Sequence, residues 1–119
     1  MNVRLGPGEV RLRLERSEAE ALGRGEAQVG TLAFPGGARL EWRVEPVPGE
    51  APPSVVLEDT QLAFAVSGEA LRALLASAPS RDAVLRAEVP ISGGAPLTLN
   101  VEIDLFGGGK GPAGRRAGS

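Results

Sequence analysis

The chain contains no cysteine, no histidine and no tyrosine. A protein without cysteine forms no disulfide and has neither a thiolate nucleophile nor a sulfur ligand for a metal. A protein without histidine lacks the side chain that most often acts as a general base near neutral pH and that transition metals most often bind. These absences favour a non-enzymatic binding protein over an enzyme, and we expect no catalytic residue, no metal site and no cofactor.

Long hydrophobic runs are also missing. The first residues, MNVRLGPGEVRLRLERSE, hold no apolar stretch long enough for a signal peptide, and no later segment is long enough to span a membrane. We therefore expect a cytoplasmic protein that does not contact a membrane.

Charge is distributed unevenly along the 119 residues. All fifteen acidic residues but only ten of the thirteen basic ones precede residue 105, so this part carries a net charge of −5. The other three basic residues lie in the glycine-rich segment 107–119, at Lys110, Arg115 and Arg116. An acidic body repels a phosphate backbone, which disfavours nucleic-acid binding. We predict one domain over residues 1–106 and a flexible tail over residues 107–119, because that segment has too little apolar surface to fold.

The first half of the chain has the pattern of a strand, a helix and two further strands. Hydrophobic residues alternate with arginine over residues 10–14, which is the period of a strand with one buried face. Ser17 and Glu20 have the spacing of a capping box, which predicts the start of a short helix. Residues 27–34 and 39–45 are predicted to form a hairpin around a Pro-Gly-Gly turn.

The second half of the chain repeats this order after a proline-rich spacer, residues 46–54. Ser67 is placed to cap a helix in which Leu71, Leu74 and Leu75 form one apolar stripe. The predicted strands of this half cover residues 55–58, 62–66, 85–91 and 97–105.

The two halves also share sequence. FPGGARLEWRVE, residues 34–45, matches ISGGAPLTLNVE, residues 91–102, at the Gly-Gly-Ala, Leu, Val and Glu positions. This match and the common order of elements indicate an internal duplication. We predict an α+β fold with two short helices and a mainly antiparallel sheet or partly closed barrel, built from two pseudo-repeated βαββ units over about residues 3–45 and 55–105.

Four residues are candidates for binding a ligand. Arg11, Arg13 and Arg43 lie on predicted outward faces of strands, where guanidinium groups can grip a carboxylate or phosphate. Their alternation with glutamate also fits ordinary ion pairs across strands. Trp42 has the spacing of a core residue, and an indole can also stack on a ligand. We take Arg11, Arg13, Trp42 and Arg43 as the candidate ligand-binding residues.

The segment VRLGPGEVRLRLERSEAEAL resembles the opening of a bacterial family of small proteins of unknown function, in which a basic strand precedes an R-[LF]-R-L strand and an [ST]-x-[ST]-E helix start. The matching residues are Arg4, Arg11, Leu12, Arg13, Leu14, Ser17 and Glu18. The later FPGGARLEWRVEP and LNVEIDL look like that family's middle hairpin and last strand. Family members end this strand in D-F-x-C-L, whereas this chain has Asp104-Leu105-Phe106 and no cysteine. The resemblance implies no activity and no catalytic residue.

Two functions fit these observations. The first is a non-enzymatic protein-interaction module, which binds a protein partner or a second copy of itself through a sheet face or an edge strand. The second is a binding protein for a small anionic ligand, because paired βαββ units are similar to the vicinal-oxygen-chelate architecture, in which two modules form a cupped sheet around a ligand. That architecture binds its metal through histidine and glutamate, so a version of it in this chain binds no transition metal.

Overall fold

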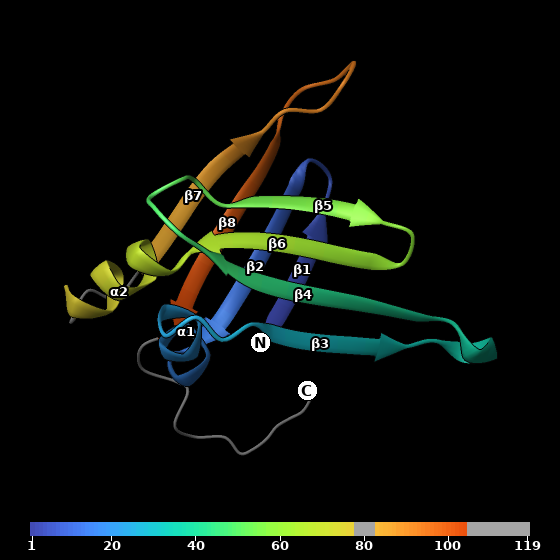
Figure 1. The fold of residues 1–119 in the computed structure, drawn as a ribbon. Coiled ribbons are helices and arrows are strands. Elements are labelled where there is room, and N and C mark those ends of the chain that lie inside the picture. The colour runs from blue at the N-terminus through green and yellow to red at the C-terminus, as the bar shows by residue number, and fades with distance from the viewer. Residues whose placement is uncertain (78–82, 105–119) are drawn as a thin grey trace.

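The computed structural model describes residues 1–77 and 83–104, and it shows an α+β fold (Figure 1). Two helices and eight strands make up these residues. The flexible tail predicted for residues 107–119 lies outside the described residues. The predicted boundary of the domain at residue 106 lies outside them as well.

The first half of the chain forms a hairpin, a helix and a second hairpin. Its elements are β1 (Asn2–Gly6), β2 (Glu9–Glu15), α1 (Arg16–Gly23), β3 (Gln28–Ala33) and β4 (Arg39–Val47). A short 3₁₀ turn, Pro35–Gly37, joins β3 to β4. Both glycines of this turn have positive φ angles, 86° at Gly36 and 88° at Gly37, a conformation that favours glycine.

The second half follows the same order. Its elements are β5 (Ser54–Glu58), β6 (Gln61–Ser67), α2 (Gly68–Ala76), β7 (Ala83–Val89) and β8 (Leu97–Asp104). The predicted order of strand, helix, strand and strand is therefore present twice. In each half one further strand precedes this order, β1 in the first half and β5, which was predicted over residues 55–58, in the second.

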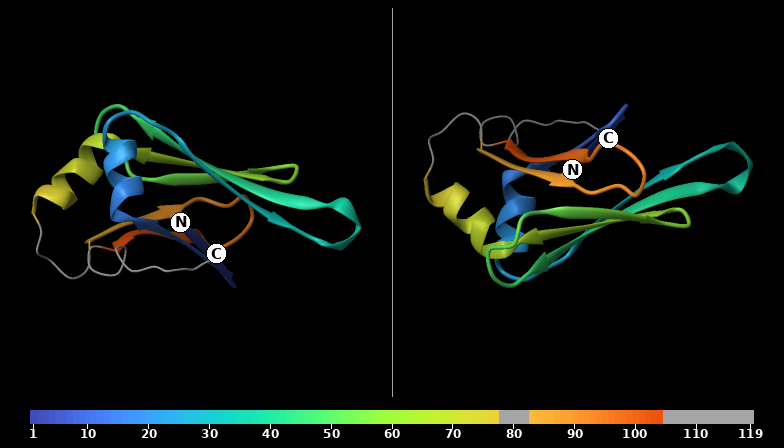
Figure 2. Two further views of the ribbon diagram at one scale, coloured as in Figure 1. Left: turned by 90° about the horizontal axis from the view of Figure 1, so that it is seen from below. Right: turned by 90° about the horizontal axis from the view of Figure 1, so that it is seen from above.

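The eight strands form two four-stranded sheets, and each sheet takes one hairpin from each half of the chain. Sheet A has the order β1-β2-β8-β7 and sheet B has the order β3-β4-β6-β5. The central pairs, β2 with β8 and β4 with β6, are parallel, and the other pairs are antiparallel. The sheets are open and packed as two layers, with both helices at one end (Figure 2). They form neither one cupped sheet nor a closed barrel within the part of the chain that the structure describes.

The strand registers of the two halves agree. Val3 pairs with Leu12 in the first half, and Val55 pairs with Phe64, each 52 positions later, in the second. The parallel pairs agree as well. Leu12 pairs with Val101, and Phe64, the counterpart of Leu12, pairs with Val44, the counterpart of Val101. These registers support the predicted internal repeat.

The hydrophobic core lies between the two sheets. The central strands supply its fully buried residues, among them Leu12, Val44, Phe64 and Val101. The helices close one end of this core through residues such as Leu22 and Leu71. Because inward and outward side chains alternate along each strand, the polar residues of β2, β4 and β8 lie on the outer faces of the sheets.

The start of the first helix differs from the prediction. The N-cap is Glu15 rather than Ser17, and the backbone N–H of Glu15 donates to a carboxylate oxygen of Glu18 over 2.8 Å. The reason is that β2 runs on to Glu15, which pairs with Asp104, so the chain passes from strand to helix without a loop. In the second half the prediction is confirmed, because the hydroxyl of Ser67 caps α2 by accepting a hydrogen bond from the Ala70 N–H.

The strand β4 extends beyond its predicted end at residue 45 and includes Pro46. This proline has no N–H to donate. It is tolerated because β3 pairs with β4 only as far as Val44, so Pro46 has a neighbouring strand on one side alone among the described residues.

Candidate functional site

Two of the candidate arginines, Arg11 and Arg13, lie on the outer face of sheet A. Arg11 is paired with Glu9 over 2.9 Å and lies 4.0 Å from Glu102. The hydrogen bond from its guanidinium to Glu9, and then the charges of Glu9 and Glu102, raise the pKa of Arg11 above its ordinary value. Arg13 approaches Asp104 to 3.6 Å and Glu102 to 3.9 Å. Both arginines therefore already have carboxylate partners.

A row of hydrogen bonds continues this pattern across the sheet. Asn100 is only 4% exposed although it lies on the outer face. Its amide N–H donates to Glu9 over 3.1 Å, and its oxygen accepts from Arg86 over 2.9 Å. The outer face of sheet A is thus a network of paired charges, which fits the cross-strand interpretation of the arginines better than an open anion site.

The third candidate arginine lies on the opposite side of the molecule. Arg43 is on β4, between the inward-facing Trp42 and Val44, so it projects from the outer face of sheet B. It forms an ion pair with Glu45 on the same strand. The structure therefore does not bring Arg43 together with Arg11 and Arg13.

Trp42, the fourth candidate, packs against the core and covers a glycine on the neighbouring strand. Its pairing partner across the β3–β4 ladder is Gly30. A Cβ atom built on Gly30 would lie 2.3 Å from the indole Nε1, so the ring occupies the place of a side chain there. The indole nitrogen is buried and has no hydrogen-bond partner among the described residues. A buried donor without a partner is uncommon in folded proteins.

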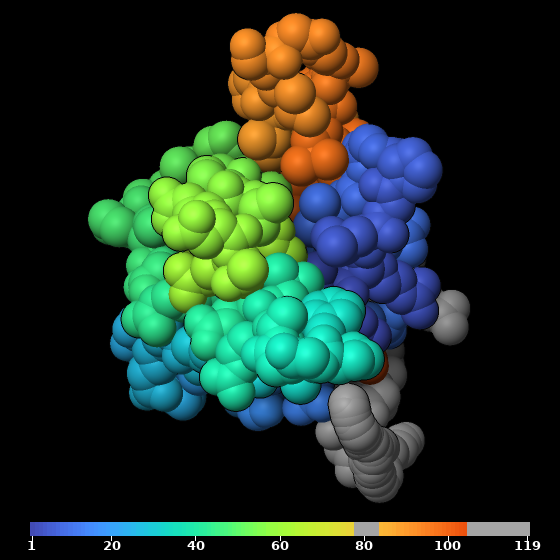
Figure 3. Space-filling model, turned by 90° about the vertical axis from the view of Figure 1, so that its right-hand side faces the viewer, coloured from blue at the N-terminus to red at the C-terminus, as the bar shows by residue number. Residues whose placement is uncertain are grey.

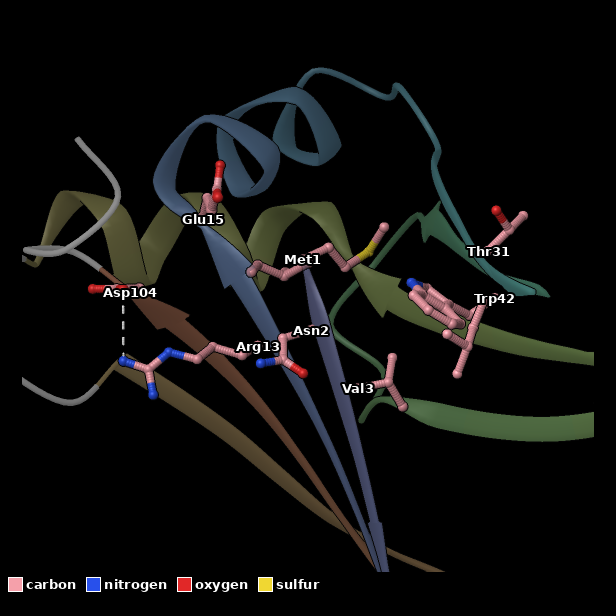
Figure 4. A pocket seen from close by; sticks show the side chains of 10 residues that line it. Met1, Asn2, Val3, Arg13, Glu15, Thr31, Trp42 and Asp104 are labelled. Carbon is pink, nitrogen blue, oxygen red and sulfur yellow. Dashed lines mark ion pairs between the residues drawn. The ribbon is translucent and has the colours of Figure 1, made fainter. Parts of the chain in front are cut away.

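Trp42 and Arg13 line the same pocket, which opens between the start of β1 and the hairpin of β3 and β4. The pocket has a volume of about 670 Å³. Its apolar wall consists of Met1, Val3, Leu14, Leu32 and Trp42, and its polar wall includes Arg13, Thr31 and Asp104. Figure 4 shows the Met1 side chain extending toward Trp42, with Arg13 and its ion pair to Asp104 at the other side of β1.

The N-terminus of the chain holds this pocket in place. The Met1 ammonium pairs with Glu18 of α1 over 3.0 Å, and the Met1 side chain is only 6% exposed. The same Glu18 carboxylate accepts the hydrogen bond that caps α1. One carboxylate therefore fixes both the first helix and the wall of the pocket.

One edge of β3 has no neighbouring strand among the described residues, and this free edge forms another side of the pocket. Sequence patterns did not single it out. β3 is the terminal strand of sheet B. Its sequence, QVGTLA, contains no charged residue. Val29 and Leu32 on this strand are 54% and 49% exposed. The sequence did contain a signal for this edge, because the strand has neither a charged residue nor a proline. Charged residues and proline are what keep most edge strands from pairing with another chain.

Further exposed hydrophobic residues lie near the turns of the hairpins. Figure 3 shows the side of the molecule to which the β3–β4 and β5–β6 hairpins point. Large side chains that remain exposed near these turns are Leu5, Leu32, Phe34, Leu57 and Ile91.

Residues 1–77 and 83–104 contain no group of three or more acidic side chains placed to hold a metal ion. Within the same residues, neither helix is long and apolar enough to cross a membrane.

Comparison of the chain with protein-family models, with curated proteins and with solved structures finds no match. The resemblance of the N-terminal segment to a bacterial family therefore stays a prediction.

Proposed function

We propose that this protein is a non-enzymatic protein-interaction module that adds an extended strand to the free edge of β3. The observation that carries this proposal is the edge itself, which is uncharged and presents two half-exposed hydrophobic residues, Val29 and Leu32. Strand addition is an established mode of recognition, in which backbone hydrogen bonds provide affinity and side-chain pockets provide specificity.

The pocket beside β3 supplies the specificity that this mode requires. A strand added to β3 places alternate side chains on the inner face of sheet B. There they meet Gly30, which has no side chain of its own, and the indole of Trp42 beside it. We therefore expect the added strand to carry a hydrophobic residue at this position.

A peptide selection tests this proposal. A displayed library of eight-residue peptides is selected for binding to the wild-type protein and counter-selected against the Thr31→Pro variant. This proline removes an N–H from the free edge of β3. We expect enriched peptides with alternating hydrophobic residues and at least tenfold weaker binding to the variant. Peptides that bind both proteins equally well, or no enrichment at all, would contradict strand addition at β3.

The pocket also supports a second function, the binding of a small anionic ligand with an apolar body. The specific observation is the buried N–H of Trp42, which has no partner among the described residues and lies in a pocket that Arg13 also lines. A ligand carbonyl or carboxylate would satisfy this donor if the Met1 side chain moves aside.

An anionic apolar dye, anilinonaphthalene sulfonate, tests this second function. The chain has one tryptophan and no tyrosine, so its intrinsic fluorescence comes from Trp42. We expect saturable quenching of Trp42 by the dye and weaker binding to Arg13→Gln. The matched control is Arg43→Gln, which changes an arginine on the opposite outer face. Equal binding to both variants would contradict a ligand site in this pocket.

A further inference from the structure

The strand β3 differs in charge from every other edge strand that the structure describes. The sheet edges are β1 and β7 in sheet A and β3 and β5 in sheet B. β1 contains Arg4, β5 contains Glu58, and β7 contains Arg86 and Glu88. β3 has no charged residue. Two copies of β3 can therefore pair in any register without placing like charges opposite each other, whereas two copies of β1 or β5 bring two like charges to the shared edge.

The backbone of β3 presents its free hydrogen-bonding groups at alternate residues. At the β3–β4 turn the N–H of Phe34 donates to the carbonyl of Ala38 over 2.8 Å. Because the groups of an antiparallel strand point to its two sides in turn, the even-numbered residues of β3 bond to β4. The N–H and C=O groups of Val29, Thr31 and Ala33 point away from β4, toward the open side of the sheet.

We infer that the strand added to β3 is β3 of a second copy of the chain, in antiparallel register around a twofold axis at Thr31. This inference rests on the proposed function and names its partner. Thr31 of one copy then faces Thr31 of the other, and Val29 faces Ala33. All three residues with outward-pointing backbone groups are paired in this register. Sheet B becomes one continuous sheet through both molecules.

The inner face of this register is complementary to itself. Leu32 of the second copy lies opposite Gly30, whose side-chain position the Trp42 ring fills, so the leucine meets the indole there. Leu32 is 49% exposed in the single chain and lines the pocket beside Trp42. Because the axis is twofold, each copy contributes one leucine and receives one. The exposed leucine of each copy therefore packs against the indole of the other copy.

The cysteine-free sequence permits a direct test of this register. In the inferred dimer the two Thr31 Cα atoms lie about 5.5 Å apart as a hydrogen-bonded antiparallel pair, a separation that a disulfide spans. The Thr31→Cys variant should therefore form a covalent dimer in a glutathione redox buffer. The matched control is Val29→Cys on the same strand and the same face, whose Cα atoms lie about 13 Å apart in this register. The double variant Val29→Cys, Ala33→Cys should cross-link again, because Val29 of one copy faces Ala33 of the other in this register.

Sedimentation velocity of the unmodified chain provides the second readout. Because the interface is small, we expect a concentration-dependent equilibrium between monomer and dimer. Val29→Lys, which brings a charge to the edge, and Thr31→Pro should remain monomeric at concentrations where the wild type dimerises. Arg4→Lys on β1 serves as the control and should dimerise as the wild type does.

Several results would overturn the inferred dimer. A wild type that stays monomeric, with Thr31→Cys cross-linking no faster than Val29→Cys, excludes it. A dimer that persists in both Val29→Lys and Thr31→Pro has a different interface. Preferential cross-linking of Val29→Cys shows a different register. The proposed function has its own test, because peptides that bind wild type and not Thr31→Pro keep strand addition at β3 even if the chain is a monomer.

Discussion

At the scale of single residues, Gly30 has a structural role that its type does not indicate. Alanine usually stabilises a strand relative to glycine, because glycine loses more backbone freedom on folding. At Gly30 the effect should be reversed, since an added Cβ lies 2.3 Å from the indole Nε1 of Trp42. We expect Gly30→Ala to lower the free energy of unfolding by about 1–3 kcal/mol, as in an overpacked core, and to shift the fluorescence maximum of Trp42.

Gly6 supplies the matched control for this prediction. It also lies in an edge strand, and a Cβ built on it meets no atom within 4 Å. Gly6→Ala should therefore leave stability unchanged or raise it by about 0.4–1 kcal/mol. If urea denaturation gives the same midpoint shift for both variants, the contact between Gly30 and Trp42 does not stabilise the fold.

Ser67 is a second residue with a defined role, and its cap of α2 was predictable. Its hydroxyl accepts from the Ala70 N–H and donates to the carbonyl of Gly49, and the residue is fully buried. We expect Ser67→Ala to destabilise the protein by about 1–2 kcal/mol, as for other N-cap replacements, measured by urea denaturation. Ser77→Ala, which removes an exposed hydroxyl at the other end of α2, should cost less than about 0.5 kcal/mol. Equal losses would contradict the capping role.

The candidate residues show what spacing predicts and what it leaves open. The inward direction of Trp42 follows from the alternation of Leu40, Trp42 and Val44, and the structure has it inward. The same alternation places Arg11 and Arg43 outward, as found. It gives no information on which sheet each strand joins, and so it could not show that these two arginines lie on opposite sides of the molecule.

At the scale of elements, the alternate direction of the backbone groups of β3 makes a sharp prediction about proline. Thr31→Pro removes an N–H that points to the open side and should leave the ladder between β3 and β4 intact. Leu32→Pro removes an N–H that donates to β4 and should cost about 1–3 kcal/mol more. Thermal or urea denaturation of dilute monomer measures the difference. A larger loss of stability for Thr31→Pro than for Leu32→Pro would show that the odd-numbered residues of β3, and not the even-numbered ones, bond to β4.

The helices illustrate a limit of local patterns. Ser17 and Glu20 have the spacing of a capping box, yet the cap is formed by Glu15 and Glu18. The tertiary pairing of Glu15 with Asp104 decides where the strand ends, and this contact joins residues that are far apart in the sequence. Similarly, Pro46 belongs to a strand because its place at the end of β4 requires hydrogen bonds on one side only.

At the scale of the whole molecule, the sequence predicted the α+β class and the order of elements in each half. It did not predict that the halves exchange hairpins between two sheets. The parallel pairs that join the halves, β2 with β8 and β4 with β6, connect strands of different units. Which distant strands pair depends on packing of the complete core, and the alternating pattern of a strand is the same for either neighbour.

The charge balance of the molecule also bears on its partners. The acidic excess before residue 105 disfavours nucleic acid, and Arg11 and Arg13 of sheet A are paired with carboxylates. The uncharged surface that is left includes the edge of β3 and its exposed hydrophobic residues. An interface built there buries no charge, so we expect its affinity to change little between low and high salt, measured by sedimentation at both salt concentrations. A strong weakening by salt would point to the charged outer face of sheet A instead.

The central claim, that the edge of β3 pairs with a second copy, is tested most directly by hydrogen exchange of single amides at low and high protein concentration. The amides of Gly30 and Leu32 bond to β4 and should be protected at both concentrations. Those of Val29, Thr31 and Ala33 should exchange rapidly in dilute protein and become protected at high concentration. If these three amides exchange rapidly at every concentration, the edge of β3 stays open and the claim is wrong.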